Sequence, residues 1–196
     1  KTILNEKSEM NPITPYERSK KEGEAKVWNM QEVFPVTIIR PAMVMGPTPY
    51  WESIFKIIRK GFPLIGKGEN AWQMIYVDDL VDFIVHAVGN EEMYNEIYIA
   101  AENETHSLRE VVDMIAEIEH VKPPKSIPKI VGIVGSHFLE LKGKVTGKKP
   151  LLIPPHVKRL LKHREYDISK ALSTGWEPKF STKEGLQKTF EEIQKK

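Results

Sequence analysis

Tyr16 and Lys20 are the residues whose types and spacing could most directly carry out chemistry. They are four positions apart, so on a helix their side chains would lie on one face, a turn apart. A free tyrosine titrates at about pH 10. An ammonium group beside it stabilises the phenolate, so such a pair can donate or accept a proton near neutral pH. The spacing therefore predicts a general acid–base pair.

The same spacing occurs a second time, at Tyr166 and Lys170, so the surrounding sequence has to decide between the two pairs. Tyr16 follows a proline-rich loop at residues 11–15, and a helix is expected to begin only after its last proline. Tyr166 instead precedes the Gly-Trp-Glu-Pro turn at residues 175–178. We therefore interpret Tyr16 as the catalytic candidate and Tyr166 as a packing residue.

The elements around Tyr16 have the pattern of one unit of a parallel α/β sheet. Good helix formers run from Tyr16 to about Met30, and the β-branched residues 33–39 then lead into Arg40-Pro41. A strand covered on both faces is apolar throughout. Further along the chain the same reasoning predicts helices at 51–60, 78–88, from 107 onward and around 131–141, and strands at 73–77 and 95–101.

Capping signals predict where several helices begin. The pairs Ser107 with Glu110 and Ser181 with Glu184 are capping boxes, which should open an amphipathic helix and the terminal helix. Asp78 or Asp79 is expected to cap the helix that follows the strand 73–77, rather than to act in catalysis.

The composition excludes several kinds of site. There is no cysteine, and the six histidines show no ligand spacing such as HExxH, so we expect neither a disulfide nor a metal site. The net charge of +2 is too balanced to predict nucleic-acid binding. The basic stretch 142–164 lacks the interleaved aromatic residues of a nucleic-acid surface.

The longest apolar stretch, residues 127–141, is interrupted by charges and is shorter than the roughly 20 residues of a membrane-spanning helix. No signal peptide is recognisable at the start of the chain. We therefore expect a cytoplasmic protein with a small-molecule substrate and with neither nucleic acid nor a membrane as partner.

Five segments, in order, resemble the extended short-chain dehydrogenase/reductase superfamily and its NAD-dependent epimerase/dehydratase family. The segment NPITPYERSKKEGEAKV resembles the catalytic helix of that family, and VTIIRPAMVMGP resembles the strand and loop beside the nicotinamide. IGKGENAWQMIYVDDLVDFIVHAV is similar to its Gly-x-Gly turn, strand and V-x-D helix start. The remaining two are NEIYIAAENETHSLREVVDMIAEI and YDISKALSTGWEPKFSTKEGLQKTF.

The resemblance implies an enzyme that moves a hydride between a substrate carbinol carbon and a nicotinamide. Tyr16 would be the acid–base at the substrate oxygen, and Lys20 would bind the nicotinamide ribose and favour the phenolate. NAD is the expected cofactor, with NADP not excluded. The residues that would contact the cofactor are Tyr16, Lys20, Pro41, Ala42, Met43 and Val44.

Three residues are candidates for substrate binding. Met45 occupies a position at which many relatives have an aromatic residue facing the substrate, and Trp72 stands where nucleotide-sugar epimerases carry an arginine for the pyrophosphate. Arg164 could take over that role or belong to a solvated basic face. The expected substrate is a nucleotide sugar. The alternatives are a less polar alcohol, sterol-like or flavonoid-like, handled by an NAD(P)H-dependent reductase or dehydrogenase, and a non-catalytic binding module of the same fold.

The fold implied is α/β, with the C-terminal part of a Rossmann-type parallel sheet and a smaller mixed α/β substrate-binding domain. Residues 1–46 would end the dinucleotide-binding domain, and residues 47–196 would be mainly substrate-binding, with 95–101 able to return to the main sheet. The glycine-rich dinucleotide fingerprint should lie upstream, because Gly66-x-Gly68 lacks the third glycine. The resemblance also implies a homodimer formed through the Tyr16 helix.

Overall fold

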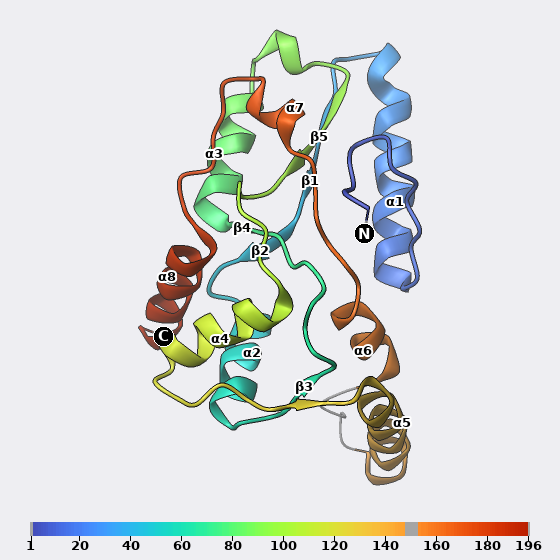
Figure 1. Cartoon of the computed structure of the whole chain (residues 1–196). Coiled ribbons are helices and arrows are strands. Elements are labelled where there is room, and N and C mark those ends of the chain that lie inside the picture. Colours follow the sequence, from blue (N-terminus) through green and yellow to red (C-terminus); the bar gives the residue numbers. More distant parts are fainter. Residues whose placement is uncertain (1, 148–152, 196) are drawn as a thin grey trace. The chain divides into compact units, whose positions relative to one another are not determined.

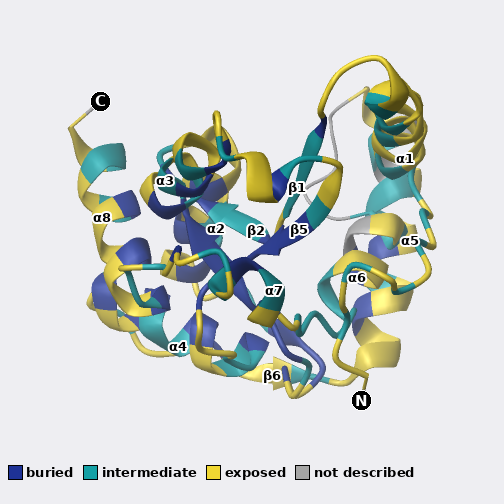
Figure 2. Ribbon diagram, turned by 90° about the horizontal axis from the view of Figure 1, so that it is seen from above, coloured by how far each residue is buried: buried dark blue, intermediate teal, exposed yellow. Residues whose placement is uncertain are grey.

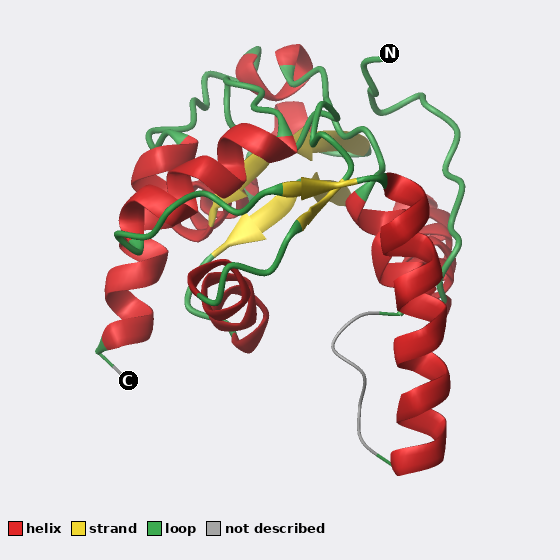
Figure 3. Cartoon of the chain, turned by 60° about the horizontal axis from the view of Figure 1, so that its bottom comes forward, coloured by secondary structure: helices red, strands yellow, loops and turns green. Residues whose placement is uncertain are grey.

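The computed structural model describes residues 2–147 and 153–195, which form helices alternating with short parallel strands (Figure 1, Figure 3). In chain order the elements are α1 Pro15–Trp28, β1 Thr37–Pro41, β2 Met43–Met45, α2 Pro49–Arg59, β3 Leu64–Ile65, β4 Met74–Tyr76, α3 Val77–Ala87, β5 Glu96–Ala100, α4 Leu108–Ile118, β6 Ser126–Ile127, α5 Lys129–Thr146, α6 Pro154–Leu160, α7 Ser169–Leu172 and α8 Thr182–Gln194. The α/β fold class with parallel strands is confirmed.

The chain divides into two compact units. The first comprises residues 1–46, 73–105 and 165–188, and the second comprises residues 47–72, 106–164 and 189–196. Each unit therefore draws on segments far apart in the sequence.

The first unit is built on two pairs of parallel strands. Strand β1 pairs with β5 from Thr37 opposite Glu96 to Pro41 opposite Ala100, and β2 pairs with β4. Helix α3 packs on β1, β2 and β4, and buried residues run along β5 (Figure 2). At the centre of this core Phe83 is fully buried, with its ring 4.4 Å from that of Trp176.

The second unit has a smaller framework. Strand β3 pairs in parallel with β6, and helix α2 packs against α4, whose inward face includes Val111 and Ile115. The rings of Phe55 and Phe190 lie 5.3 Å apart. Helix α5 packs against β3 and α6.

The predicted capping boxes are confirmed, and one predicted cap is wrong. Ser107 and Glu110 exchange backbone-to-side-chain hydrogen bonds of 2.7 and 3.2 Å, and Ser181 with Glu184 does the same. Asp79, however, lies inside the first turn of α3 and does not cap it. It is buried and accepts hydrogen bonds from the backbone N–H groups of residues 179 and 180. The carboxylate therefore binds a distant segment of the chain instead of the N-terminus of the helix.

The strand predicted at 33–39 also begins later than expected. Val33 and Phe34 are exposed, and the chain becomes extended only at β1. The intervening Pro35 carries no N–H for a strand ladder. The short strands β2, β3 and β6 were not predicted, because two or three residues give no measurable alternation.

Candidate functional site

The Tyr16–Lys20 pair lies at the start of helix α1, in the first unit. Thr14 caps the helix and forms a capping box with Glu17, and Pro15 occupies the first turn, where its missing N–H has no cost. Tyr16 is 62% exposed, and the Nζ atom of Lys20 lies 5.6 Å from the centre of its ring. The local sequence therefore places the ammonium group over an accessible tyrosine, as the spacing predicted.

Arg40 fixes helix α1 to strand β1. Its Nη2 and Nε atoms donate to the two carboxylate oxygens of Glu24 at 2.5 and 3.0 Å, and its Nη1 atom donates to the carbonyl of Glu6 at 2.8 Å. The Glu6 carboxylate in turn accepts from the backbone N–H of Ile99 on β5 at 2.9 Å. Such bidentate, charge-assisted contacts fix orientation as well as distance. The sequence marked Arg40 only as the end of a strand.

The four residues predicted to line the nicotinamide lie where β1 ends and β2 begins. Pro41 is exposed, Ala42 is buried and donates its N–H to the carbonyl of Ala100 at 2.8 Å, and Met43 and Val44 are half-buried. In parallel sheets, ligands bind beyond the carboxyl ends of the strands. An exposed proline beside small and apolar side chains, in the same unit as an accessible Tyr–Lys pair, fits a nicotinamide ring and its ribose.

Met45 is completely buried in the same unit. A Cβ atom on Gly185 would lie 2.6 Å from its Cε atom, so the thioether fills the space that the missing side chain leaves. This packing gives no support to the substrate contact that the resemblance implies, which stays a prediction.

Trp72 and Arg164 lie side by side in the second unit. The backbone N–H of Arg164 donates to the carbonyl of Ala71 at 2.9 Å, and its guanidinium carbon lies 5.8 Å from the centre of the Trp72 ring. The indole is buried, and its N–H has no hydrogen-bond partner among the described residues. The structure thus brings together two of the three substrate-binding candidates.

Tyr50 belongs to the same cluster, although the sequence did not single it out. Burial raises the pKa of its phenol, and the nearby positive charges of Arg159 and Arg164 oppose that shift. The Arg164 guanidinium group therefore lies beside the Trp72 indole and within electrostatic range of Tyr50, which is 48% exposed. This combination suits an anionic group flanked by flat apolar surface.

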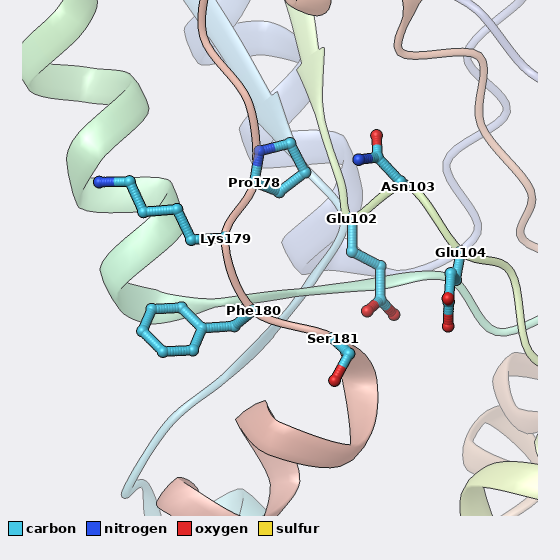
Figure 4. A pocket seen from close by; sticks show the side chains of 7 residues that line it. All are labelled: Glu102, Asn103, Glu104, Pro178, Lys179, Phe180 and Ser181. Carbon is cyan, nitrogen blue, oxygen red and sulfur yellow. The ribbon is translucent and has the colours of Figure 1, made fainter.

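A hollow of about 150 Å³ in the first unit holds a carboxyl group that the sequence did not single out. Glu102 is 2% exposed; one carboxyl oxygen accepts from the Thr182 hydroxyl, and the other has no hydrogen-bond partner within the described ranges. Burial, and then the charge of Glu104, raise the pKa of Glu102 to about 8. Figure 4 shows both glutamates on one side of the hollow. The other lining residues are Asn103 and Pro178–Ser181.

Within residues 2–147 and 153–195, no cluster of three or more His, Cys, Asp or Glu side chains could hold a metal ion. None of the helices described in those ranges is long and apolar enough to cross a membrane.

Comparisons with known proteins give one consistent family. Residues 2–101 match the NAD dependent epimerase/dehydratase family. The chain is 25% identical over 189 residues to N-acetyl-alpha-D-glucosaminyl-diphospho-ditrans,octacis-undecaprenol 4-epimerase of Escherichia coli O157:H7, covering 92% of the chain and 57% of that protein. It is 26% identical over 197 residues to 3beta-hydroxysteroid-dehydrogenase/decarboxylase isoform 1 of Arabidopsis thaliana, covering 90% and 45%.

Among solved structures, the fold is similar to that of UDP-glucuronic acid 4-epimerase from Bacillus cereus in complex with NAD. The TM-score is 0.71 at 20% identity, covering 99% of this chain and 56% of that one. The Rossmann-type fold is thereby confirmed. The chain spans about half the length of the curated relatives it matches.

Proposed function

The chain belongs to the NAD-dependent epimerase/dehydratase family, and from this premise we propose that the protein is an NAD-dependent oxidoreductase of the epimerase or dehydratase type. The observation that carries the proposal is the accessible Tyr16–Lys20 pair on a capped helix, which Arg40 ties to the strand leading into Pro41.

The side chains of Tyr16 and Lys20 have different roles in the proposed reaction. The Tyr16 hydroxyl transfers a proton at the substrate's carbinol or carbonyl oxygen, and the ammonium group of Lys20 favours the phenolate and holds ribose hydroxyls. Bound NAD would supply the hydride acceptor. Residues 41–44 provide the apolar wall against which the nicotinamide is oriented. NAD is the proposed cofactor on the family match, and NADP is the alternative.

We propose a nucleotide sugar, or a similar diphosphate-linked sugar, as the substrate. The name of the Escherichia coli relative includes a sugar joined to a diphosphate, which supports this class. Arg164, stacked on Trp72, offers a guanidinium group of the kind that binds phosphate oxygens in pairs. The second candidate is a less polar alcohol, favoured by the buried Trp72 at a position where nucleotide-sugar epimerases carry arginine, and by the name of the Arabidopsis thaliana relative.

The two substrate classes can be separated by calorimetry on the full-length protein. Binding of UDP that is lost in Arg164→Ala supports the diphosphate-linked sugar. Absence of UDP binding to the unsubstituted protein, together with saturable binding of a sterol alcohol, supports the second class.

The catalytic assignment is tested by Tyr16→Phe in the full-length protein, with Tyr166→Phe as the matched control. Tyr16→Phe should lower turnover by about 10²-fold or more, the usual contribution of general acid–base catalysis, while NAD binding and thermal stability are retained. Tyr166→Phe should keep turnover, because Tyr166 packs against the buried cluster around Ile99 and Ile168. Wild-type turnover in Tyr16→Phe would contradict the role of Tyr16.

Two further features concern assembly and cellular location. The family resemblance implies a homodimer through α1, which stays a prediction; because the exposed side chains of α1 are mainly charged, such an interface would be polar. The reducing, cytoplasmic compartment rests on the absence of cysteine.

A further inference from the structure

Helix α5 packs through its small residues. Gly132 and Ser136 are buried, and a Cβ atom on Gly132 would lie 2.4 Å from Ile65 of strand β3. The Ser136 hydroxyl donates to the carbonyl of Ile133 at 2.7 Å, so its polarity is satisfied within the helix. The helix backbone can therefore approach β3 closely on this face.

The large apolar side chains of α5 point outward instead. Val134, Phe138 and Leu141 follow one another at spacings of four and three residues and form a stripe on one face. In a helix that packs in a globular unit, such residues normally face the protein core. The exposed fractions are 65% for Ile130, 52% for Val131, 37% for Ile133, 61% for Val134, 67% for Phe138 and 61% for Leu141. A set of exposed large apolar side chains on one helix marks an interaction surface.

The charges of the following sequence and of helix α6 indicate what the stripe contacts. The sequence from 142 to 164 contains lysine and arginine but no aspartate or glutamate. Helix α6, which packs against α5, exposes Lys158 and Arg159. The only acidic residue of α5 is Glu140, which already has an interaction within the protein. An apolar stripe on a helix that packs against a basic helix complements an anionic lipid surface, whereas pairing two copies through it would bring like charges together.

We propose that α5 docks on the surface of an anionic lipid bilayer, with Ile130, Val134, Phe138 and Leu141 inserted among the lipids and the exposed basic side chains of α6, Lys158 and Arg159, against the headgroups. The helix lies in the interface and does not span it, in keeping with the lack of any spanning helix in the described ranges. This proposal differs from the prediction that the protein has no membrane partner, and it stands independently of the proposed substrate.

The test is flotation of the full-length protein with vesicles of phosphatidylcholine and phosphatidylglycerol in equal amounts. The protein should float with these vesicles, less in high salt and less with pure phosphatidylcholine. The double variant Val134→Ser/Phe138→Ser should bind about tenfold more weakly or worse. Its matched control is Val85→Ser/Val88→Ser, which removes two exposed valines, 65% and 77% exposed, from the other unit and should bind as wild type.

A Phe138→Trp variant gives a second measurement that removes no apolar surface. Its additional fluorescence should shift to the blue with the anionic vesicles. The proposal is overturned if the wild-type protein fails to bind those vesicles, or if the stripe variant binds equally well. A concentration-dependent dimer that the stripe variant abolishes, without vesicle binding, would assign the stripe to a second copy. Blue-shifted fluorescence of Phe138→Trp in the lipid-free monomer would assign the stripe to a contact within the same chain and would overturn the proposal.

Discussion

Alanine substitutions at Gly132 and at Gly135 of helix α5 should have opposite effects on stability. The substitution at Gly132 should destabilise the protein, and the substitution at Gly135 should stabilise it. Gly132 faces Ile65, and an added Cβ would lie 2.4, 2.8 and 2.9 Å from three of that side chain's carbon atoms. Gly135, three residues later, has no atom within 4 Å of such a Cβ. The two substitutions therefore differ only in what the new methyl group meets.

The magnitude follows from two opposing contributions. In a helix interior, alanine is favoured over glycine by about 1 kcal/mol, so Gly135→Ala should stabilise the protein by about that amount. At Gly132 the same gain is offset by overpacking, which costs about 1–3 kcal/mol. Ile65 is buried and β-branched, so its side chain cannot turn aside cheaply. The helix preference cancels in the comparison, and Gly132→Ala should be less stable than Gly135→Ala by about 2 kcal/mol.

Thermal unfolding followed by circular dichroism measures this difference. For a domain of this size, about 2 kcal/mol corresponds to roughly 4–8 °C in Tm, well above experimental error. Equal stabilisation by both alanines would refute the packing of Gly132 on Ile65. It would also remove the reason for placing Phe138 and its neighbours outward, because the orientation of the helix is the same in both arguments.

Two other predictions concern buried charge and the position of helix α1. The pKa of Glu102 is raised to about 8. A proton is therefore held in the folded state and released from the unfolded state between about pH 4.5 and pH 8, and stability falls across that window by up to about 1.4 kcal/mol per pH unit. Glu102→Gln should flatten this slope in thermal melts; an unchanged slope would contradict the assignment to Glu102. Arg40→Lys should lose one of the two contacts with Glu24, lowering stability by about 1 kcal/mol and turnover with it. If Glu24→Gln has the same effect and the two changes combined cost no more than either alone, the pair acts as a unit; additive losses would argue against it.

The sequence by itself determined the features that depend on neighbouring residues. The capping boxes at Ser107 and Ser181, the helix that starts beside Tyr16, and the apolar strand that leads to Arg40 all follow from local backbone and side-chain chemistry. Those signals were sufficient for the α/β class and for the order of motifs that resembles the family.

Only the tertiary structure decided the features that depend on contacts between residues far apart in the sequence. Asp79 binds the segment at residues 179 and 180, and Glu102 is enclosed by residues from the start of α8; in both cases the partner lies about 80–100 positions along the chain, beyond the reach of spacing arguments. The direction of α5 was hidden for the same reason. Its apolar composition suggests burial, but close packing of Gly132 against Ile65 turns the large side chains outward, because only a residue without a side chain fits there.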